Sequence, residues 1–411
     1  MTIDLLAASD APQRTPWADP DSYWGAMTDA VAGVPAPAAA LHLDALRYNA
    51  LDMLVRAAGV PIRVASKSVR VREVLDAVLR LPGYRGILAF TLPEALWLAE
   101  THGDIVLGYP SVDRAALRVL ASDERAASRI TVMVDDLAQL DALDAVAPPT
   151  GRPEIRVAID ADASWRAPGL GHVGVRRSPV HEAAEVAALA RAIARRPGVR
   201  VVGLMMYEAQ IAGQGDATGA GDPVIRWMQR RSAQELRDRR AAIVDAVRAI
   251  APLEFVNGGG TGSLELTAAD QSVTELTAGS GLLAGHLFDG YQAFDPAPAA
   301  AFALDVVRRP APDIVTVLGG GWIASGPPVA SRQPQPVWPH GLRTLAREGA
   351  GEVQTPLQGR AAAGLALGDR VWFRHAKSGE LAERVDAYHL VGAGAPAGTA
   401  PTYRGEGKAF L

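Results

Sequence analysis

Short apolar runs alternate with longer amphipathic stretches through the middle of the chain. Apolar residues that recur every three or four positions predict helices over 70–80, 180–196 and 231–250. The short runs predict strands at 61–65, 86–90, 104–107, 130–134, 155–160, 200–206, 253–257 and 273–277. Eight strands alternating with helices over about 220 residues predict an α/β fold, a closed parallel (β/α)8 TIM barrel rather than an open doubly wound sheet.

The last third of the chain has a different pattern. Its apolar runs at 302–309, 313–318, 367–374 and 384–391 are broken by Pro and Gly and predict a second, mostly antiparallel β domain. We therefore divide the chain into an N-terminal extension at 1–34, the barrel at 35–298 and the β domain at 299–411.

Lys67 stands directly after the first predicted barrel strand. The sequence holds three lysines against 38 arginines, so a lysine at this point is unusual. A desolvated lysine can lose its proton and act as a nucleophilic amine or a base, whereas a guanidinium stays protonated. Chemistry in such barrels lies on the loops that follow the strands, which favours a catalytic Lys67 over a lysine that only reaches into solvent.

Two glycine clusters follow the seventh and eighth predicted strands, at 258–263 and 279–281. Consecutive glycines let backbone N–H groups converge on an anion, and barrels commonly bind phosphate at these two loops. The alternative is two tight turns without a ligand. A Walker-type loop is excluded because no Gly-Lys-Ser/Thr follows, and the GxGxxG match at 169–174 lacks the flanking pattern of a dinucleotide site. An amine and a phosphate cup in one barrel suit pyridoxal 5'-phosphate.

Composition narrows the function classes. The chain has 411 residues, 49% hydrophobic and 21% charged, as in a globular protein large enough for two domains. A formal net charge of −4 gives no general attraction to nucleic acid or to an anionic membrane. The absence of cysteine excludes disulfides and thiolate chemistry. No apolar run or leader pattern predicts a membrane span or export, so a cytoplasmic location is expected.

The order of several motifs resembles the fold-type III pyridoxal phosphate enzymes, which join an alanine racemase-like barrel to a β domain. The resemblance covers roughly 35–411, and the β domain is similar to the D-threonine aldolase and D-serine dehydratase branch, also labelled amino acid deaminase/aldolase. It rests on Leu43-Asp44-Ala45-Leu46-x-x-Asn49, Ser66-Lys67-Ser68, Asp160-x-Asp162-x-x-x-Arg166, Tyr207 and Gly258-Gly259-Gly260-Thr261-Gly262.

The resemblance implies a role for each matched residue. Lys67 would carry the cofactor as a Schiff base and act as the base at Cα. Arg166 would lie near the cofactor or the substrate carboxylate, and Tyr207 would contact the cofactor ring. The remaining cofactor residues would bind phosphate: Gly259, Gly260, Thr261, Gly279 and Gly281. The alternatives are a surface arginine at Arg166 and simple core packing at Tyr207.

The same branch places metal ligands in its β domain, and this sequence departs from that pattern. It offers His375 and His389, with no cysteine and no acid two residues after His375. The two histidines are the candidate ligands for a divalent cation. Without a metal, His375 would act as acid and base on the substrate hydroxyl.

These observations favour a lyase that acts on a small β-hydroxy amino acid of D configuration, with aldol cleavage into a glycine-type amino acid and an aldehyde. The alternatives are a D-serine-type dehydratase, an amino acid racemase with Tyr388 or Tyr403 as second base, a non-enzymatic carrier of pyridoxal phosphate, and a cofactor-free Schiff-base aldolase. By resemblance we expect a homodimer.

Overall fold

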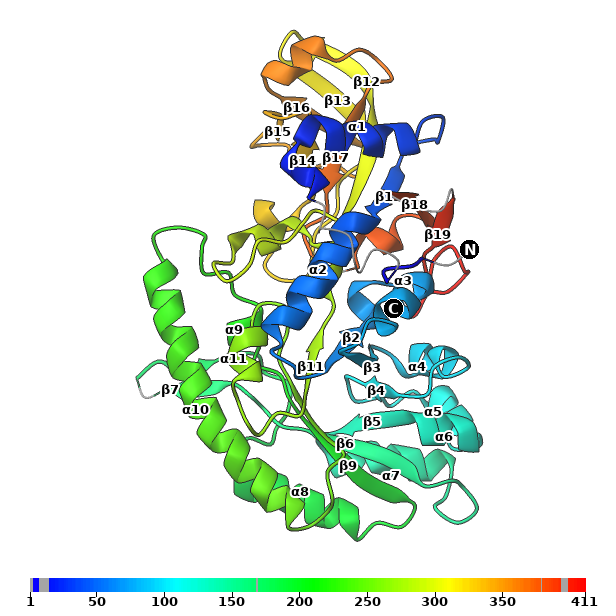
Figure 1. Cartoon of the computed structure of the whole chain (residues 1–411). Coiled ribbons are helices and arrows are strands. Elements are labelled where there is room, and N and C mark those ends of the chain that lie inside the picture. Colours follow the sequence, from blue (N-terminus) through cyan, green and yellow to red (C-terminus); the bar gives the residue numbers. More distant parts are fainter. Residues whose placement is uncertain (1–2, 7–14, 168, 378, 393–397) are drawn as a thin grey trace. The chain divides into compact units, whose positions relative to one another are not determined.

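The computed structural model describes residues 3–6, 15–167, 169–377, 379–392 and 398–411 (Figure 1). The chain forms two compact units. One contains 53–67, 82–278 and 410–411 and is called the barrel unit below. The other contains 1–52, 68–81 and 279–409 and is called the sheet unit.

Eight parallel strands close the barrel in the order β10-β11-β2-β3-β4-β5-β6-β9. Their bounds are β2 Ile62–Ala65, β3 Tyr84–Ala89, β4 Ile105–Leu107, β5 Ile130–Val134, β6 Ile155–Asp160, β9 Val199–Met206, β10 Phe255–Gly258 and β11 Glu275–Ala278. The eight predicted strands and the closed parallel barrel are therefore confirmed.

Helices follow most barrel strands, as the amphipathic stretches predict. In the barrel unit they are α4 Leu92–Leu98, α5 Arg114–Leu120, α6 Glu124–Arg129, α7 Leu137–Val146, α8 Ala183–Ala194, α9 Ala209–Ala212, α10 Asp222–Arg248 and α11 Leu264–Ala268. Side chains of Asp113, Asp123 and Asp136 accept hydrogen bonds from the first turns of α5, α6 and α7, which fixes where these helices begin. A short hairpin, β7 Trp165–Ala167 with β8 Gly171–Val173, interrupts the connection from β6 to α8.

Side chains fill the barrel interior. Val106, Met133 and Met205 form one buried cluster with Phe255, whose ring would lie 2.2 Å from a Cβ at position 203, so only glycine fits there. Towards the amino ends of the strands, the buried Arg63 donates two hydrogen bonds of 2.8 Å to Glu275. This buried ion pair stabilises the end of the barrel at which the strands begin. In barrels of this type the catalytic residues lie at the opposite end.

The sheet unit is built on a nine-stranded sheet. Its path is β15-β16-β13-β12-β1-β18-β19, and β17 pairs with β12 and β14. The strands are β1 Ala38–His42, β12 Ala300–Ala311, β13 Ile314–Leu318, β14 Gln335–Trp338, β15 Arg343–Thr344, β16 Gln354–Gln358, β17 Arg370–Arg374, β18 Ala387–Val391 and β19 Thr399–Pro401. All pairs are antiparallel except β1 with β18. The predicted antiparallel β domain is confirmed.

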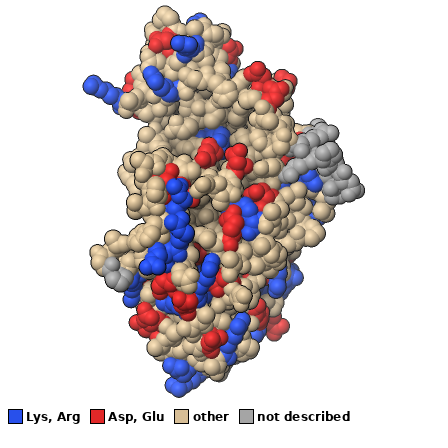
Figure 2. Space-filling view, turned by 60° about the vertical axis from the view of Figure 1, so that its left-hand side comes forward, with Lys and Arg blue, Asp and Glu red and all other residues tan. Residues whose placement is uncertain are grey.

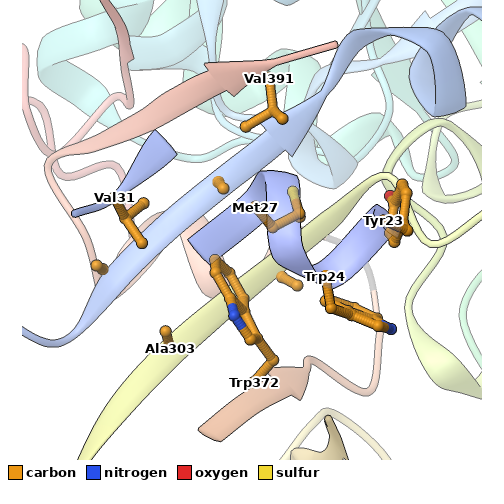
Figure 3. Close-up of a cluster of buried hydrophobic side chains, with 10 residues drawn as sticks. Tyr23, Trp24, Met27, Val31, Ala303, Trp372 and Val391 are labelled. Carbon is orange, nitrogen blue, oxygen red and sulfur yellow. The ribbon is translucent and has the colours of Figure 1, made fainter. Parts of the chain in front are cut away.

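Helix α1 Pro20–Ala30 covers part of this sheet (Figure 3). Trp24 and Met27 pack against Trp372 of β17, and the Trp372 indole N–H donates a hydrogen bond of 2.9 Å to Thr28 Oγ1. The partner of the N-terminal extension, which the sequence does not identify, is thus the sheet. The unit also contains α2 Leu43–Arg56 as far as residue 52, α3 Arg72–Leu79 and α12 Ser280–Leu283.

The division into units differs from the one expected from the sequence. Strand β1 lies within the segment assigned to the barrel, yet it pairs with β12 and β18 and takes residues 1–52 into the sheet unit. Figure 2 shows basic and acidic side chains interspersed over the face in view, in keeping with the small net charge. In the described part of the chain, no helix combines the length and apolar character needed to cross a membrane.

Candidate active site

Polar side chains gather where the barrel strands end. Lys67 follows β2, Tyr109 follows β4 and Tyr207 follows β9, while Gly259 follows β10. Carboxyl ends of parallel strands meet at the same rim of a barrel, so these residues share one end of the barrel. As predicted, Lys67 and Tyr207 lie on loops that follow barrel strands.

The amine of Lys67 is held by a tyrosine that the sequence did not single out. Lys67 Nζ donates a hydrogen bond to Tyr109 Oη at 2.8 Å. The Arg177 guanidinium carbon lies 5.9 Å from the centre of the Tyr109 ring and 5.6 Å from that of Tyr207. These cation–π contacts connect the loops after β4, β6 and β9, and the hydrogen bond from Lys67 adds the loop after β2. Tyr109 carried one signal, its position just after a predicted strand, whereas Arg177 lies in a loop with no motif.

The glycine loop after β10 is shaped by a buried glutamate. Glu208, 2% exposed, accepts hydrogen bonds from the backbone N–H of Gly259 and from Ser263 Oγ, both at 3.2 Å. Gly259 has φ +83°, which favours glycine. A Cβ on Gly260 would lie 2.8 Å from the Ala212 Cβ, so the absence of a side chain lets the loop approach α9.

Two further contacts position the same loop. Arg56 Nη2 donates a hydrogen bond of 2.6 Å to the carbonyl of Thr261. The edge of the Tyr207 ring would lie 3.2 Å from a Cβ on Gly260, so the tyrosine and the glycine loop are neighbours. An amine on one loop, with an aromatic ring beside a glycine-rich loop on another, fits a flat aldehyde cofactor that carries a phosphate. Gly279 and Gly281 lie at and within the start of α12, in the sheet unit, and stay predictions as phosphate ligands.

Carboxylates line the ends of β5 and β6. Burial raises the pKa of Asp160 to about 7, and the charge of Asp135 adds to the rise, while Arg177 opposes it. Burial also raises the pKa of Tyr207 to about 12, so its hydroxyl stays protonated at neutral pH. A phenol and a carboxyl that both keep protons near neutrality can donate hydrogen bonds at the barrel end.

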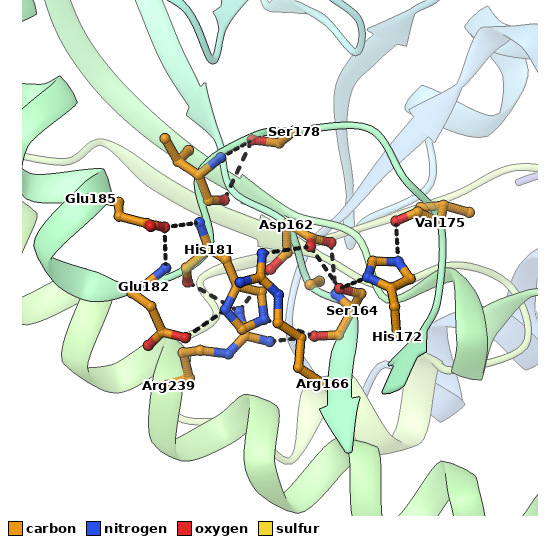
Figure 4. Close-up of polar contacts among 12 residues, drawn as sticks. Asp162, Ser164, Arg166, His172, Val175, Ser178, His181, Glu182, Glu185 and Arg239 are labelled. Atoms are coloured by element: carbon orange, nitrogen blue, oxygen red, sulfur yellow. Dashed lines mark hydrogen bonds and ion pairs between the residues drawn. The ribbon is translucent and has the colours of Figure 1, made fainter. Parts of the chain in front are cut away.

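The loop from β6 to α8 places Arg166 at its outer part (Figure 4). Arg166 Nη2 lies 3.8 Å from Asp162 Oδ2, and the arginine side chain is 51% exposed. The cation that lies over Tyr109 and Tyr207 is Arg177 instead. Arg166 lines an open cavity of about 620 Å³ formed by this loop, and its expected role at the cofactor or carboxylate stays a prediction.

The two histidines proposed as metal ligands lie in the sheet unit. His375, fully buried, directly follows β17, and His389 lies on β18. The register pairs Phe373 with Phe302 and His389 with Ala40, so His389 faces the side opposite to Phe373. The role of the two histidines as metal ligands stays a prediction, and no group of three His, Asp or Glu side chains suited to a metal occurs among the described residues.

The closed parallel barrel, Lys67 after β2 and the glycine-rich loop after β10 together define a protein of the pyridoxal phosphate-binding class. Residues 41–283 match the family model described as alanine racemase, N-terminal domain, and the chain belongs to this family. A D-threonine aldolase from an Arthrobacter species is 30% identical over 322 residues, covering 74% of this chain and 78% of that protein. A 3-hydroxy-D-aspartate aldolase from Paracoccus denitrificans is 28% identical over 250 residues, 60% of either chain.

A solved structure agrees with the fold. D-threonine aldolase from Filomicrobium marinum superposes with a TM-score of 0.74 at 21% identity, covering 90% of this chain and 94% of that one. The resemblance to fold-type III enzymes is thus confirmed. The chain is a pyridoxal phosphate-dependent lyase.

Proposed function

We propose that this lyase cleaves the Cα–Cβ bond of a D-β-hydroxy amino acid and releases a glycine-type amino acid and an aldehyde. The observation that carries the proposal is Lys67, an amine held by Tyr109 at the barrel end beside the glycine loop, in a chain 30% identical to a D-threonine aldolase. When bound, pyridoxal phosphate supplies an electron sink for the pair left at Cα.

The residues of the chain have separate tasks in this proposal. Lys67 Nζ would hold the cofactor covalently, and the Tyr109 hydroxyl orients that amine. The loop 259–261 would hold the phosphate, and Tyr207 would pack against the cofactor ring. Arg177 keeps a positive charge over both tyrosine rings.

Cleavage also requires a base for the proton of the β-hydroxyl. His375 is the candidate, because imidazole can take a proton near neutral pH. His375→Asn should slow cleavage at least about a hundredfold while pyridoxal phosphate still binds. An unchanged rate would remove His375 from the reaction. A chelator, followed by addition of divalent metal, tests the proposed cation at His375 and His389 in the same assay.

Product analysis with one enantiomer separates the chemistries. D-threonine incubated in deuterated water should give glycine and acetaldehyde. A keto acid with ammonia would indicate a dehydratase. Deuterium at Cα of recovered D-threonine together with its Cα epimer, L-allo-threonine, would indicate a racemase. Either result in place of aldehyde would overturn the aldolase proposal.

Attachment of the cofactor is tested by borohydride reduction of the yellow protein, digestion and mass mapping. The reduced pyridoxyl group is expected on Lys67, and Lys67→Ala should abolish it together with turnover. Lys408→Ala is the matched control, because it removes one of the other two lysines. Light scattering of the same preparation tests the expected homodimer.

A further inference from the structure

The loop between β6 and α8 forms a cavity with a strong charge bias. The open volume of about 620 Å³ is lined by three arginines and a histidine, against one carboxylate. The arginines are Arg166, Arg176 and Arg177, the histidine is His172, and the carboxylate is Asp162.

The carboxylate that lines the cavity, Asp162, already has hydrogen-bond partners within the loop. Asp162 accepts hydrogen bonds from the Ser164 backbone N–H at 2.9 Å and from Ser164 Oγ at 2.6 Å, and its other neighbour is Arg166. Asp162 therefore offsets one arginine at most. Burial raises the pKa of Asp160 to about 7, which limits the negative charge that this second carboxyl sets against Arg177, so the cavity keeps a positive charge. Such a site attracts an anion and excludes a cation.

Arg177 connects the cavity to the reacting end of the barrel. Its guanidinium stacks over Tyr109, whose hydroxyl accepts the hydrogen bond from Lys67. Within the residues that the structure describes, Arg177 makes no hydrogen bond to another side chain and no ion pair with a carboxylate. Its planar set of donors is thus held in place by two rings and is available to an oxyanion.

The described residues at both ends of this loop are held by hydrogen bonds (Figure 4). Arg239 donates hydrogen bonds to the carbonyls of Asp162 at 2.7 Å and of Ser164 at 2.9 Å. Ser178 Oγ, next to Arg177, donates to the carbonyl of Asp160 at 2.7 Å. A ligand that binds in the cavity does not have to order these parts of the loop. The entropic cost of binding is therefore lower.

We propose that this cavity binds the distal carboxylate of the substrate, with Arg177 as the residue that contacts it, so that the enzyme prefers 3-hydroxyaspartate-type dicarboxylates to D-threonine. The inference rests on the proposed function and narrows its substrate class. A second carboxylate two carbons from Cα lies within reach of an arginine that stacks on the tyrosine bound to Lys67. The methyl group of threonine would leave the guanidinium without a counter-charge.

The test compares kcat/KM of the holoenzyme for D-3-hydroxyaspartate and D-threonine. The wild-type ratio should favour the dicarboxylate at least about a hundredfold, since a site built for a polar group rejects an analogue without it. Arg177→Gln should lower that ratio by at least about tenfold, whereas Arg191→Gln, an exposed arginine on α8 outside the cavity, should leave it unchanged. Arg176→Gln should lower the ratio a few-fold, and less at high salt, because it acts through charge alone.

Binding of D-aspartate and D-alanine, followed by the cofactor absorbance or by calorimetry, gives a readout that needs no cleavage. D-aspartate should bind at least about tenfold more tightly than D-alanine, and Arg177→Gln should remove the difference. If neither hydroxy amino acid is cleaved but this difference is found, the aldolase proposal fails and the carboxylate site stands. If Arg177→Gln weakens both substrates and both ligands equally, Arg177 serves a group common to all of them and the inference is overturned.

Discussion

Glu208 is predicted to hold the glycine loop in its active shape. Besides Gly259 and Ser263, it accepts hydrogen bonds from Arg240 Nη2 at 3.2 Å and from Thr267 Oγ1. Arg240 in turn donates to Asp270 at 2.5 Å, and both partners of Arg240 are almost fully buried. A buried charge with this many donors is costly to remove.

Two substitutions separate charge from hydrogen bonding. Glu208→Gln keeps an oxygen towards Gly259 and Arg240, and its amide N–H₂ can donate to the two hydroxyl groups, which can rotate. Charge-assisted bonds become neutral ones, so a loss of about 1–2 kcal/mol is expected. Glu208→Ala leaves the backbone N–H of Gly259 buried without an acceptor and removes one of the two acceptors of Arg240 Nη2, the other being the Met206 carbonyl. This should cost about 3–5 kcal/mol.

The assays are thermal unfolding of the apoprotein and titration with pyridoxal phosphate. The alanine variant should unfold on the order of 10 °C below the wild type, and the glutamine variant a few degrees below it. Affinity for pyridoxal phosphate should fall at least about tenfold in Glu208→Ala and less than about threefold in Glu208→Gln. If Glu208→Ala and Glu208→Gln change the unfolding temperature or the cofactor affinity equally, the reasoning is refuted. The hydrogen bonds that glutamine can still make would then contribute nothing.

Three other changes test neighbouring parts of the molecule. Tyr109→Phe removes the acceptor for Lys67 and should lower kcat about tenfold while the reduced pyridoxyl group still maps to Lys67; unchanged kcat would leave Tyr109 without a role in orienting the amine. The pKa of Asp160 in the folded chain, about 7, exceeds its ordinary 3.8, so the folded state binds the extra proton and its stability falls as pH rises through this window, by at most about 4 kcal/mol. Urea titrations of the apoprotein from about pH 4 to about pH 8 should show a smaller fall for Asp160→Asn, and identical profiles would contradict this. Trp372→Phe opens a void and removes the hydrogen bond to Thr28, which should destabilise the sheet unit by about 2–3 kcal/mol in denaturant titrations, and a loss below about 0.5 kcal/mol would show that the site repacks.

The barrel could be predicted because its strands are apolar runs buried on both sides. Strand β1 could not, because its residues, Ala-Ala-Ala-Leu-His, have low strand propensity and pair only with strands far along the chain. Such pairing is decided by tertiary contacts that a local pattern does not contain.

The residues of the candidate site also fall into those that the sequence predicts and those that it does not. Lys67 and the glycine loop are recognisable from residue type and position after a strand, and the structure places both at the predicted end of the barrel. Arg177 is positioned by two tyrosines on other loops, and Glu208 by donors on the loop after β10 and on α11. A sequence read one segment at a time cannot reveal residues whose importance arises from partners on separate segments.

The path of the chain through its two units has a consequence for synthesis. All eight barrel strands have been made when residue 278 emerges, whereas β1 must wait for β12 at Ala300–Ala311 and β18 at Ala387–Val391. On the ribosome the central barrel can therefore form while the first fifty residues still lack their sheet and the apolar face of α1 has nothing to cover. During that interval the side chains of Trp24 and Met27, which the sheet buries in the folded protein, are exposed to water.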